Sequence, residues 1–434
     1  MQIKTVTVIG ANGAMGANIS GIFASFGDAK VYMVGRDPEK IKIAREKGAK
    51  SVKADKVAEN LIAADYSELS AIIPESDLVF ESVAEDISIK TKIYNAIIPH
   101  LREDAIICTG TSSLSVDDFA AILPKKLQSR YFGVHFFNPP YNMPLCELIA
   151  PDCADALLAK ELEDYLKDQL LRKVVPVKNA PAFLANRIGF QFINHAMQYA
   201  ELLADKGGID YIDSILGSFT GRAMPPLLTA DFVGLDIHKA IVDNLFENTN
   251  DFFNDTFKLP AFAAGLIAEN KLGRKTAGGL YKTEVIDGKK VKMVYDIKTD
   301  SYRKMKTYHL PFADQMKAQL RNGDYADAFQ TLIHDSSEDG ALCLHLLIEY
   351  IAYSVLTAEQ IGYSIPSADT VMAEGFNWCP PLAMAGALGK VADLKSLIKN
   401  HLGAEVLRQI DLNHLLGLIC ESSYDFRPYF KIGR

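Results

Sequence analysis

The chain has 434 residues, of which 49% are hydrophobic, so it is long enough to bury more than one core and is neither disordered nor fibrous. The formal net charge of -8 argues against nucleic-acid binding, because there is no overall excess of Lys and Arg to neutralise phosphates. The six cysteines lack CxxC or other metal-ligand spacing, which indicates reduced thiols, a cytoplasmic setting and no metal site.

We expect neither an export signal nor a membrane span. A strand pattern begins near Val6, and no basic region with an apolar segment and a cleavage site precedes it. The apolar stretch 342–356 is interrupted by His345, Glu349 and Ser354, which is unfavourable for a helix that crosses a bilayer.

A glycine-rich turn follows the first predicted strand, residues 5–9, and leads into an apolar helical pattern. Strand, glycine turn and helix together are typical of dinucleotide-binding folds, because glycines let the backbone approach a pyrophosphate at the helix N-terminus. The spacing Gly-x-x-Gly-x-x-Gly makes this turn one residue longer than Gly-x-Gly-x-x-Gly. A glycine turn without a ligand is the alternative, but the flanking elements favour NAD or NADP. The candidate cofactor residues are Gly10, Asn12, Gly13, Ala14, Met15 and Gly16.

The second predicted strand, residues 31–34, ends in Gly35, Arg36 and Asp37. An acid at the strand end would accept hydrogen bonds from the adenosine ribose and repel a 2′-phosphate. Gly35 in that place, followed by Arg36, weakens the case for NAD and permits NADP, although Asp37 could still reach the ribose. Cations outnumber acids over residues 36–56, which predicts either a solvated helix face or a place for a phosphate-rich ligand.

Three further strand patterns, 78–80, 105–108 and 132–134, alternate with helical patterns and predict a mostly parallel, doubly wound sheet of the Rossmann type. Ligands lie at the carboxyl ends of strands in such sheets, and His135 follows one of them. Glu147 comes twelve residues later, after a proline-containing turn between two strand-like runs. This arrangement could fold the carboxylate back beside the imidazole and make an oriented base. A core histidine with a solvated loop acid is the alternative.

Long helical patterns begin after residue 177, and they contain an internal repeat: 212–234 is echoed by 369–389. Asn186 and Arg187 lie in the first apolar helix, as buried hydrogen-bonding groups or as site residues. The second copy has no counterpart of this pair, so we expect it to be structural. The predicted organisation is a dinucleotide-binding domain over 1–178, a first helical domain over 179–284, a polar linker over 285–340 and a second helical domain over 341–434.

Several motifs, in the same order along nearly the whole chain, resemble the 3-hydroxyacyl-CoA dehydrogenase family. The duplicated helical part resembles the long form of that family, without an enoyl-CoA hydratase unit. The motifs are Gly10 to Gly16, Phe80-Glu81-Ser82-Val83-Ala84-Glu85, Thr111-Ser112-Ser113-Leu114, His135-Phe136-Phe137-Asn138-Pro139, Pro181-Ala182-Phe183-Leu184-Ala185-Asn186-Arg187, Met224-Pro225-Pro226, Asp231-Phe232-Val233-Gly234-Leu235-Asp236 and Leu272-Gly273-Arg274-Lys275-Thr276.

The resemblance implies an NAD(P)-dependent oxidoreductase of fatty acid β-oxidation that interconverts (S)-3-hydroxyacyl-CoA and 3-oxoacyl-CoA. It implies that His135 is the general base oriented by Glu147, that Ser112 and Asn186 hold the C3 oxygen, and that Glu85 and Lys90 contact the nicotinamide end of the cofactor. The sequence departs from the family pattern at Gly35, Gly110 and Ala182.

Two alternatives to this activity stay open. One is another two-domain β-hydroxyacid or nucleotide-sugar dehydrogenase. Such enzymes usually carry a Lys or a Cys in the helical region as the reacting group, and no Cys lies in a comparable place here. The other is a non-catalytic nucleotide-binding relative, which the joint presence of Ser112, His135, Glu147 and Asn186 disfavours. In single-copy relatives the helical domain makes the dimer interface, so we expect either a monomer with an internal pseudo-dimer or a homodimer, with acyl-CoA as the partner.

Overall fold

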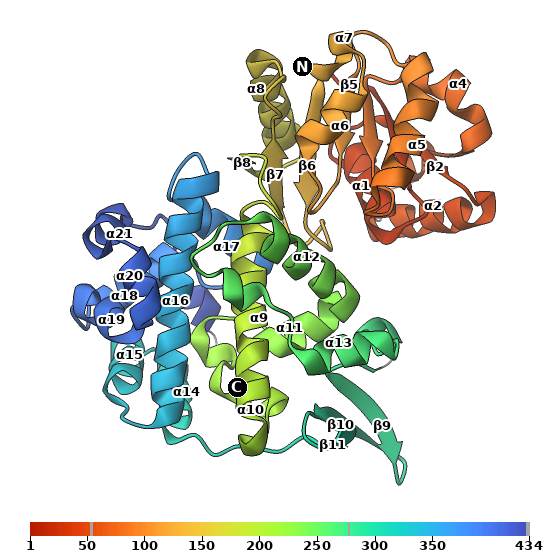
Figure 1. Ribbon diagram of the computed structural model, residues 1–434. Coiled ribbons are helices and arrows are strands. Elements are labelled where there is room, and N and C mark those ends of the chain that lie inside the picture. Colours follow the sequence, from red (N-terminus) through yellow and green to blue (C-terminus); the bar gives the residue numbers. More distant parts are fainter. Residues whose placement is uncertain (53–54, 277, 431–434) are drawn as a thin grey trace. The chain divides into compact units, whose positions relative to one another are not determined.

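The computed structural model describes residues 1–52, 55–276 and 278–430 (Figure 1). It divides into two compact units. The first comprises Met1–Phe183 together with Ile361–Tyr363, and the second comprises the rest of the described chain. The predicted boundary at residue 178 therefore lies close to the observed one.

An eight-stranded sheet forms the centre of the first unit, in the order β3-β2-β1-β4-β5-β6-β7-β8. Neighbours from β3 to β6 are parallel, β7 is antiparallel to β6, and β8 is parallel to β7. The predicted Rossmann-type sheet is thereby confirmed. The strands are β1 Thr5–Ile9, β2 Lys30–Gly35, β3 Leu61–Asp65, β4 Leu78–Glu81, β5 Ile106–Thr109, β6 Tyr131–Phe136, β7 Leu145–Ile149 and β8 Lys173–Val177.

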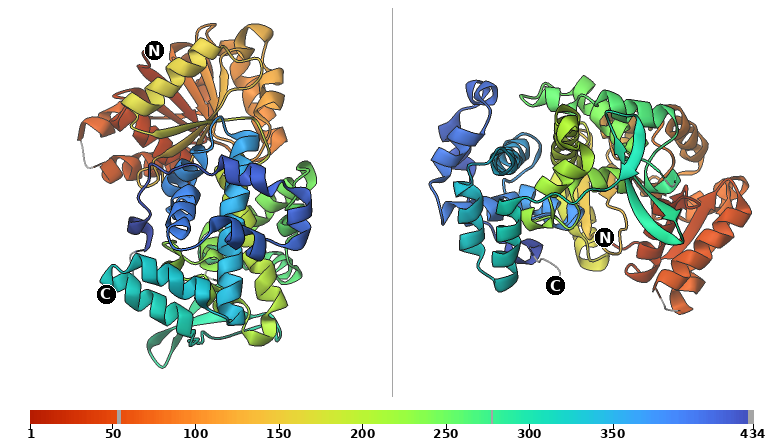
Figure 2. Two further views of the ribbon diagram at one scale, coloured as in Figure 1. Left: turned by 90° about the vertical axis from the view of Figure 1, so that its left-hand side faces the viewer. Right: turned by 90° about the horizontal axis from the view of Figure 1, so that it is seen from below.

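Helices cover both faces of this sheet, as Figure 2 shows. On one face the rings of Phe23, Phe80 and Phe136 follow one another with centroids 6.1 and 5.9 Å apart. On the other face Tyr94 of α5 packs edge-on against Tyr131 of β6 at 5.7 Å. Burial on both faces explains why the strands are almost continuously apolar. The helices are α1 Ala14–Ser25, α2 Pro38–Val52, α3 Asp55–Asn60, α4 Leu69–Ile72, α5 Ile87–Ile97, α6 Val116–Ile122, α7 Lys125–Gln128 and α8 Ala156–Asp164.

The second unit is mainly helical and is built around α9 and the long helix α16, which are labelled in Figure 1. By length and composition α16 could cross a membrane, but 78% of its most apolar window is buried inside the fold, as in the core helix of a globular domain. The helices are α9 Ala185–Leu202, α10 Ile209–Ile215, α11 Pro226–Val233, α12 Leu235–Asn248, α13 Ala261–Ala268, α16 Glu338–Ile361, α17 Ser367–Phe376, α18 Pro381–Gly389, α19 Leu394–His401, α20 Ala404–Gln409 and α21 Leu412–Leu418.

The segment 285–340, which the sequence predicts to be an irregular linker, is folded. Strands β9 Tyr281–Ile286, β10 Lys289–Asp296 and β11 Ser301–Lys304 form an antiparallel sheet, followed by α14 Pro311–Asn322 and α15 Tyr325–His334. The Arg303 guanidinium donates to both carboxylate oxygens of Asp210 on α10, at 2.7 and 2.8 Å, which ties the sheet to the helices. Much of this small sheet is exposed, which agrees with the polar composition of the segment. The strands lie almost wholly within the predicted linker, and the flanking parts of the unit are mainly helical, as expected.

The two halves of the predicted repeat use the same local contacts inside one compact unit. Asp213 accepts hydrogen bonds from two backbone N–H groups at the start of α11, both at 2.9 Å, and Asp369 accepts one at the start of α18 at 2.7 Å. Arg222 and Trp378, from the two halves, form an isolated β-bridge. The Arg222 guanidinium lies 3.9 Å from the ring centroid of Phe192 and 4.8 Å from that of Trp378. A buried cation between aromatic rings thus joins the halves.

Candidate active site

The glycine turn lies between β1 and α1, and its backbone conformation requires glycine at its first position. Gly10 has a φ of +89°, and a Cβ there would lie 2.3 Å from the carbonyl oxygen of Ser82. A Cβ on Gly16 would lie 2.6 Å from the carbonyl oxygen of Gly10, so this glycine lets α1 pack closely on the turn. Ala14, Met15 and Gly16 form the first turn of α1, whose N–H groups are suited to an anion.

A cleft of about 620 Å³ opens at the carboxyl ends of β1, β2, β3 and β4. Four predicted residues, Gly10, Asn12, Gly13 and Arg36, line it. Gly10 and Gly13 contribute only backbone to its lining, which fits a dinucleotide whose phosphates approach the backbone. The sequence does not single out Asp65, Tyr66 and Ser67, because β3 has a weak, alanine-rich strand pattern. The other lining residues are Asp65, Tyr66, Ser67, Ser82, Val83, Ala84, Ile89, Lys92 and Ile93.

Asp37, a candidate for reading the ribose, caps helix α2. Its Oδ1 atom accepts hydrogen bonds from the backbone N–H groups of Glu39 and Lys40, at 3.1 and 3.2 Å. The Lys40 Nζ atom lies 3.7 Å from Oδ2 of the same carboxylate. Asp37 does not line the cleft, and its position is explained by helix capping.

Glu85 and Lys90 are both held by protein groups, and neither lines the cleft. Lys90 is 1% exposed; its Nζ lies 2.9 Å from both carboxylate oxygens of Glu81 and 3.4 Å from Glu85. Glu81 also accepts a hydrogen bond from the Thr109 hydroxyl at 2.7 Å. One buried cation therefore compensates two carboxylates at the carboxyl end of β4.

Glu85 fixes the turn that follows β5 and carries Ser112. Its Oε1 atom accepts hydrogen bonds from the Thr111 hydroxyl at 2.6 Å and from the N–H groups of Ser112 and Ser113 at 2.8 and 2.9 Å. Burial raises the pKa of Glu85, but the Lys90 charge and the hydrogen bonds from the turn outweigh burial and hold the pKa below its usual value. Glu85 is thus a carboxylate that orients Ser112.

His135 and Glu147 form a buried pair on the neighbouring strands β6 and β7. They lie directly opposite each other in the antiparallel register, and His135 Nδ1 is 2.8 Å from Glu147 Oε2. The predicted turn brings the carboxylate beside the imidazole because β6 and β7 are wholly buried apolar strands that pair. The exposed fractions are 4% for His135 and 0% for Glu147, so water screens the pair poorly.

The surroundings of His135 determine which of its nitrogens could act as a base. A carboxylate at Nδ1 favours the tautomer with the proton on that atom, which leaves the lone pair on Nε2. The rings of Phe137 and Phe183 pack against the imidazole, with centroids at 4.6 and 5.6 Å. The packed rings hold the imidazole in place, and the carboxylate fixes its tautomer. Both features are expected of an oriented general base.

Asn186 belongs to the second unit, near the start of α9, where it is buried. Its neighbour Arg187 is part of a buried network in that unit. The Arg187 guanidinium donates to Asp251 at 2.7 Å and to Gln360 at 2.9 Å, and the Tyr353 hydroxyl donates to Asp251 at 2.7 Å. Arg187 is therefore a structural hydrogen-bonding group that links α9 to α16, whereas the role of Asn186 stays a prediction.

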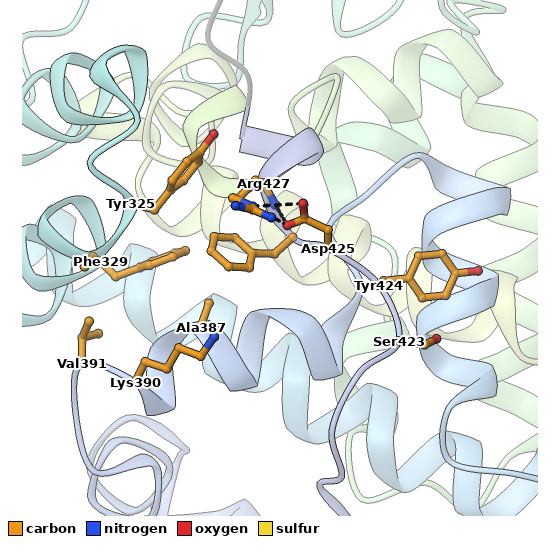
Figure 3. Close-up of a pocket in the computed structure, with 11 residues that line it drawn as sticks. Tyr325, Phe329, Ala387, Lys390, Val391, Ser423, Tyr424, Asp425 and Arg427 are labelled. Carbon is orange, nitrogen blue, oxygen red and sulfur yellow. Dashed lines mark hydrogen bonds and ion pairs between the residues drawn. The ribbon is translucent and has the colours of Figure 1, made fainter.

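A second hollow, of about 560 Å³, lies in the second unit between α15, the end of α18 and residues 423–427 (Figure 3). Tyr325 and Phe329 of α15 line it together with Lys390. The Arg427 guanidinium is engaged by Asp425, with Nε at 2.9 and 3.0 Å from the two carboxylate oxygens. None of the predicted site residues lines this hollow.

Two family models match the chain. The model described as "3-hydroxyacyl-CoA dehydrogenase, NAD binding domain" matches residues 5–180, and the model described as "3-hydroxyacyl-CoA dehydrogenase, C-terminal domain" matches residues 183–283. Together they span most of the first unit and the first copy of the helical repeat. The dinucleotide cleft and the His135–Glu147 pair both lie within the first of these matches.

Known proteins resemble the chain over different lengths. Human mitochondrial hydroxyacyl-coenzyme A dehydrogenase is 31% identical over 294 residues, which cover 64% of this chain and 91% of that protein. A protein of Rickettsia prowazekii described as a fatty acid oxidation complex trifunctional enzyme is 28% identical over 87% of this chain. The chain spans about half the length of this relative, 52%. A crystal structure of 3-hydroxybutyryl-CoA dehydrogenase from Escherichia coli K12, at 19% identity and a TM-score of 0.69, covers 96% of this chain and supports the fold.

Proposed function

The chain belongs to the 3-hydroxyacyl-CoA dehydrogenase family, and from this premise we propose that it catalyses the reversible, NAD(P)-dependent oxidation of (S)-3-hydroxyacyl-CoA to 3-oxoacyl-CoA. The observation that carries the proposal is the buried contact of 2.8 Å between His135 Nδ1 and Glu147 Oε2. The two residues belong to the same sheet whose strand ends form the glycine-lined cleft, and that cleft fits a dinucleotide.

In the proposed reaction, NAD(P) supplies the acceptor for the hydride that leaves C3. His135 Nε2 takes the proton of the C3 hydroxyl, and the imidazolium that forms is stabilised by the Glu147 carboxylate at Nδ1. In the reverse direction the same imidazolium returns the proton to the C3 oxygen. The buried position of the pair favours this role, because a charge that develops at His135 interacts strongly with Glu147 where water is excluded.

We assign the C3 oxygen to the Ser112 hydroxyl and to the side chain of Asn186, in agreement with the family resemblance. Ser112 is supported by the turn that Glu85 fixes, and Asn186 by its position near the start of a buried helix. Two donors to the same oxygen would hold C3 so that its hydrogen faces the nicotinamide while its hydroxyl faces His135. The cofactor is a nicotinamide dinucleotide, NAD or NADP.

A panel of 3-oxoacyl-CoA substrates of increasing chain length, each reduced with NADH and with NADPH, tests the proposed function. We expect measurable turnover for at least one chain length, followed as oxidation of the reduced cofactor. A folded protein that reduces no member of the panel with either cofactor would overturn the assignment. The panel also gives the preferred acyl length, which the family does not determine.

We further propose that the protein acts as a monomer in a reducing compartment such as the cytosol. The duplicated helical part already packs its two halves together within one chain, through the Arg222–Trp378 bridge and the Arg187–Asp251–Tyr353 network. All six cysteines are free thiols. Sedimentation velocity should give a mass near 47.7 kDa, whereas a stable dimer at micromolar concentration would contradict the monomer.

A further inference from the structure

The cleft has a basic side, which begins where β2 ends. We propose that Arg36 binds the 2′-phosphate of NADP, so that the cleft takes NADP(H) in preference to NAD(H). This inference rests on the proposed function only in requiring that the cleft holds the adenosine half of a nicotinamide dinucleotide. Family membership leaves the choice between NAD and NADP open, and the inference is that Arg36 determines it.

Gly35 occupies the usual place of the acid that reads the ribose, and it is closely packed. A Cβ on Gly35 would lie 2.6 Å from the Cδ1 atom of Ile41 and 2.9 Å from the Oδ1 atom of Asn12. Any side chain at this position would require Ile41 and Asn12 to move, and glycine itself offers no group at the end of β2 to accept hydrogen bonds from the 2′- and 3′-hydroxyls. The next acid, Asp37, uses its carboxylate to cap α2 and is absent from the lining of the cleft.

Arg36 is the first residue after the strand, and it is exposed and lines the cleft. Within the described part of the chain no carboxylate forms an ion pair with it, so its charge is available to an anion. Tyr66 lines the same cleft, and Arg36 is close enough to act on it. Burial raises the pKa of the Tyr66 hydroxyl, and the Arg36 charge opposes that rise. A guanidinium beside a half-buried aromatic ring suits a phosphorylated ribose with its adenine.

Asp65 is the group that opposes this assignment. It ends β3, opposite Gly35 in the parallel register, and lines the cleft. Its Oδ1 atom accepts hydrogen bonds from the N–H and hydroxyl of Ser67, at 2.7 and 2.5 Å, which lower the pKa of Asp65 and keep it ionised. A carboxylate that accepts ribose hydroxyls would favour NAD(H), and the two local donors of Asp65 both bind its Oδ1 atom, so the strength of its opposition is what the Asp65→Asn variant below measures. Arg36 would thus attract a 2′-phosphate, whereas the Asp65 carboxylate would repel it.

Three nucleotides distinguish the possible sources of the phosphate. Adenosine 2′,5′-bisphosphate is the adenosine half of NADP, adenosine 5′-monophosphate is that of NAD, and adenosine 3′,5′-bisphosphate is that of coenzyme A. The two bisphosphates carry the same charge and differ only in the position of one phosphate. A simple preference for negative charge would therefore treat them alike, whereas a site built for NADP would not.

Isothermal titration of the whole chain with each nucleotide tests the proposal without any turnover. We expect wild type to bind the 2′,5′-bisphosphate on the order of 10- to 100-fold more tightly than either other nucleotide, the usual contribution of a charge-assisted contact. Arg36→Ala should remove this preference. Lys92→Ala, which deletes another cation of the cleft, on α5, should leave the ratio unchanged. Asp65→Asn should increase the preference.

Equal binding of the 2′,5′-bisphosphate and the monophosphate by wild type would overturn the inference, as would equal effects of Arg36→Ala and Lys92→Ala. Tighter binding of the 3′,5′-bisphosphate would instead assign the phosphate to coenzyme A and also overturn it. The two proposals fail separately. A chain that prefers the 2′,5′-bisphosphate but reduces no 3-oxoacyl-CoA would contradict the dehydrogenase activity alone, and a chain that reduces 3-oxoacyl-CoA with equal nucleotide affinities would contradict the Arg36 subsite alone.

Discussion

His135 and Glu147 are direct cross-strand partners, and their side chains meet on the same face of the sheet with Nδ1 and Oε2 2.8 Å apart. The contact is set by strand register, because a slip of one residue would turn Glu147 to the opposite face. The strand pair thereby fixes both the tautomer and the orientation of the imidazole. A base that is positioned by backbone pairing loses little entropy when the substrate binds.

Replacement of the carboxylate tests the orienting role. Glu147→Gln keeps the size of the side chain but removes the charge that stabilises the imidazolium, so turnover should fall on the order of 10- to 100-fold, as for loss of a group that orients a reacting side chain. Affinity for adenosine nucleotides should not change. Glu103→Gln is the control, because Glu103 is exposed and pairs with the exposed Lys126. Equal turnover of the two variants would contradict the role of Glu147.

The turn that carries Ser112 should depend on Glu85. Glu85→Gln removes the charge that pairs with Lys90 and weakens four hydrogen bonds to one oxygen, so turnover should fall while nucleotide affinity is kept. The pKa of Glu85 lies below its usual value, so its stabilising effect is present above that usual value and is lost as the pH falls through the lowered one. Urea unfolding of wild type and variant should therefore differ at pH 7 and converge under more acidic conditions. A difference that persists unchanged would show that charge is not involved.

The glycine turn can be tested with two alanine substitutions at positive φ. Gly10 and Gly288 have φ values of +89° and +73°, but only at Gly10 would a Cβ collide with backbone, 2.3 Å from the Ser82 oxygen. Gly288→Ala should cost only the backbone strain, about 1–2 kcal/mol, and leave nucleotide binding intact. Gly10→Ala should be less stable than Gly288→Ala and should lose nucleotide affinity by more than about tenfold, because the turn must move. Nucleotide affinity that is equal in the two variants would place the cofactor elsewhere.

His238 should make the second unit sensitive to acid. Asn194 donates its amide to the carbonyl oxygens of Thr256 and Lys258, so its oxygen accepts from His238 Nε2 at 2.9 Å. Protonation would then place a hydrogen on Nδ1, which has no partner in the buried interior among the described residues. Burial accordingly lowers the pKa of His238 to about 3.

The lowered pKa of His238 makes the folded state less stable in acid. The unfolded chain takes up a proton below about pH 6.5 while the folded chain does not, so stability is full above this pH and falls as the pH decreases towards 3. Between pH 7.5 and pH 5 the loss from this residue should be about 2 kcal/mol. His238→Gln keeps a donor to Asn194 but cannot titrate, and its denaturation midpoint should vary less with pH. Parallel pH profiles of the two proteins would contradict the assignment.

Sequence patterns predict the sheet well where strands are buried on both faces, as in β1, β4 and β6. They miss β3, because its alanines weaken the strand pattern, and with it Asp65, which lies at the cofactor cleft. The segment around β10 is mistaken for a linker, because its exposed lysines conceal the strand pairing.

The candidate site is predicted in part. His135 and Glu147 come together as expected, because one turn between two apolar runs leaves few other arrangements. The position of Lys90 does not follow from its sequence, because burial beside Glu81 depends on how α5 packs on the sheet. Asn186 is predicted only through the family resemblance, since no local pattern distinguishes it from a structural amide.

The reduction of acetoacetyl-CoA by wild type and by His135→Gln is the direct test of His135 as the general base. His309→Gln is the matched control, because His309 also pairs with a carboxylate, Asp314 at 3.0 Å, but its side chain is 84% exposed. All three proteins should bind adenosine nucleotides alike. We expect turnover of His135→Gln at least on the order of 100-fold below wild type, the usual contribution of a positioned acid–base group, and normal turnover of His309→Gln. Normal turnover of His135→Gln would contradict the account.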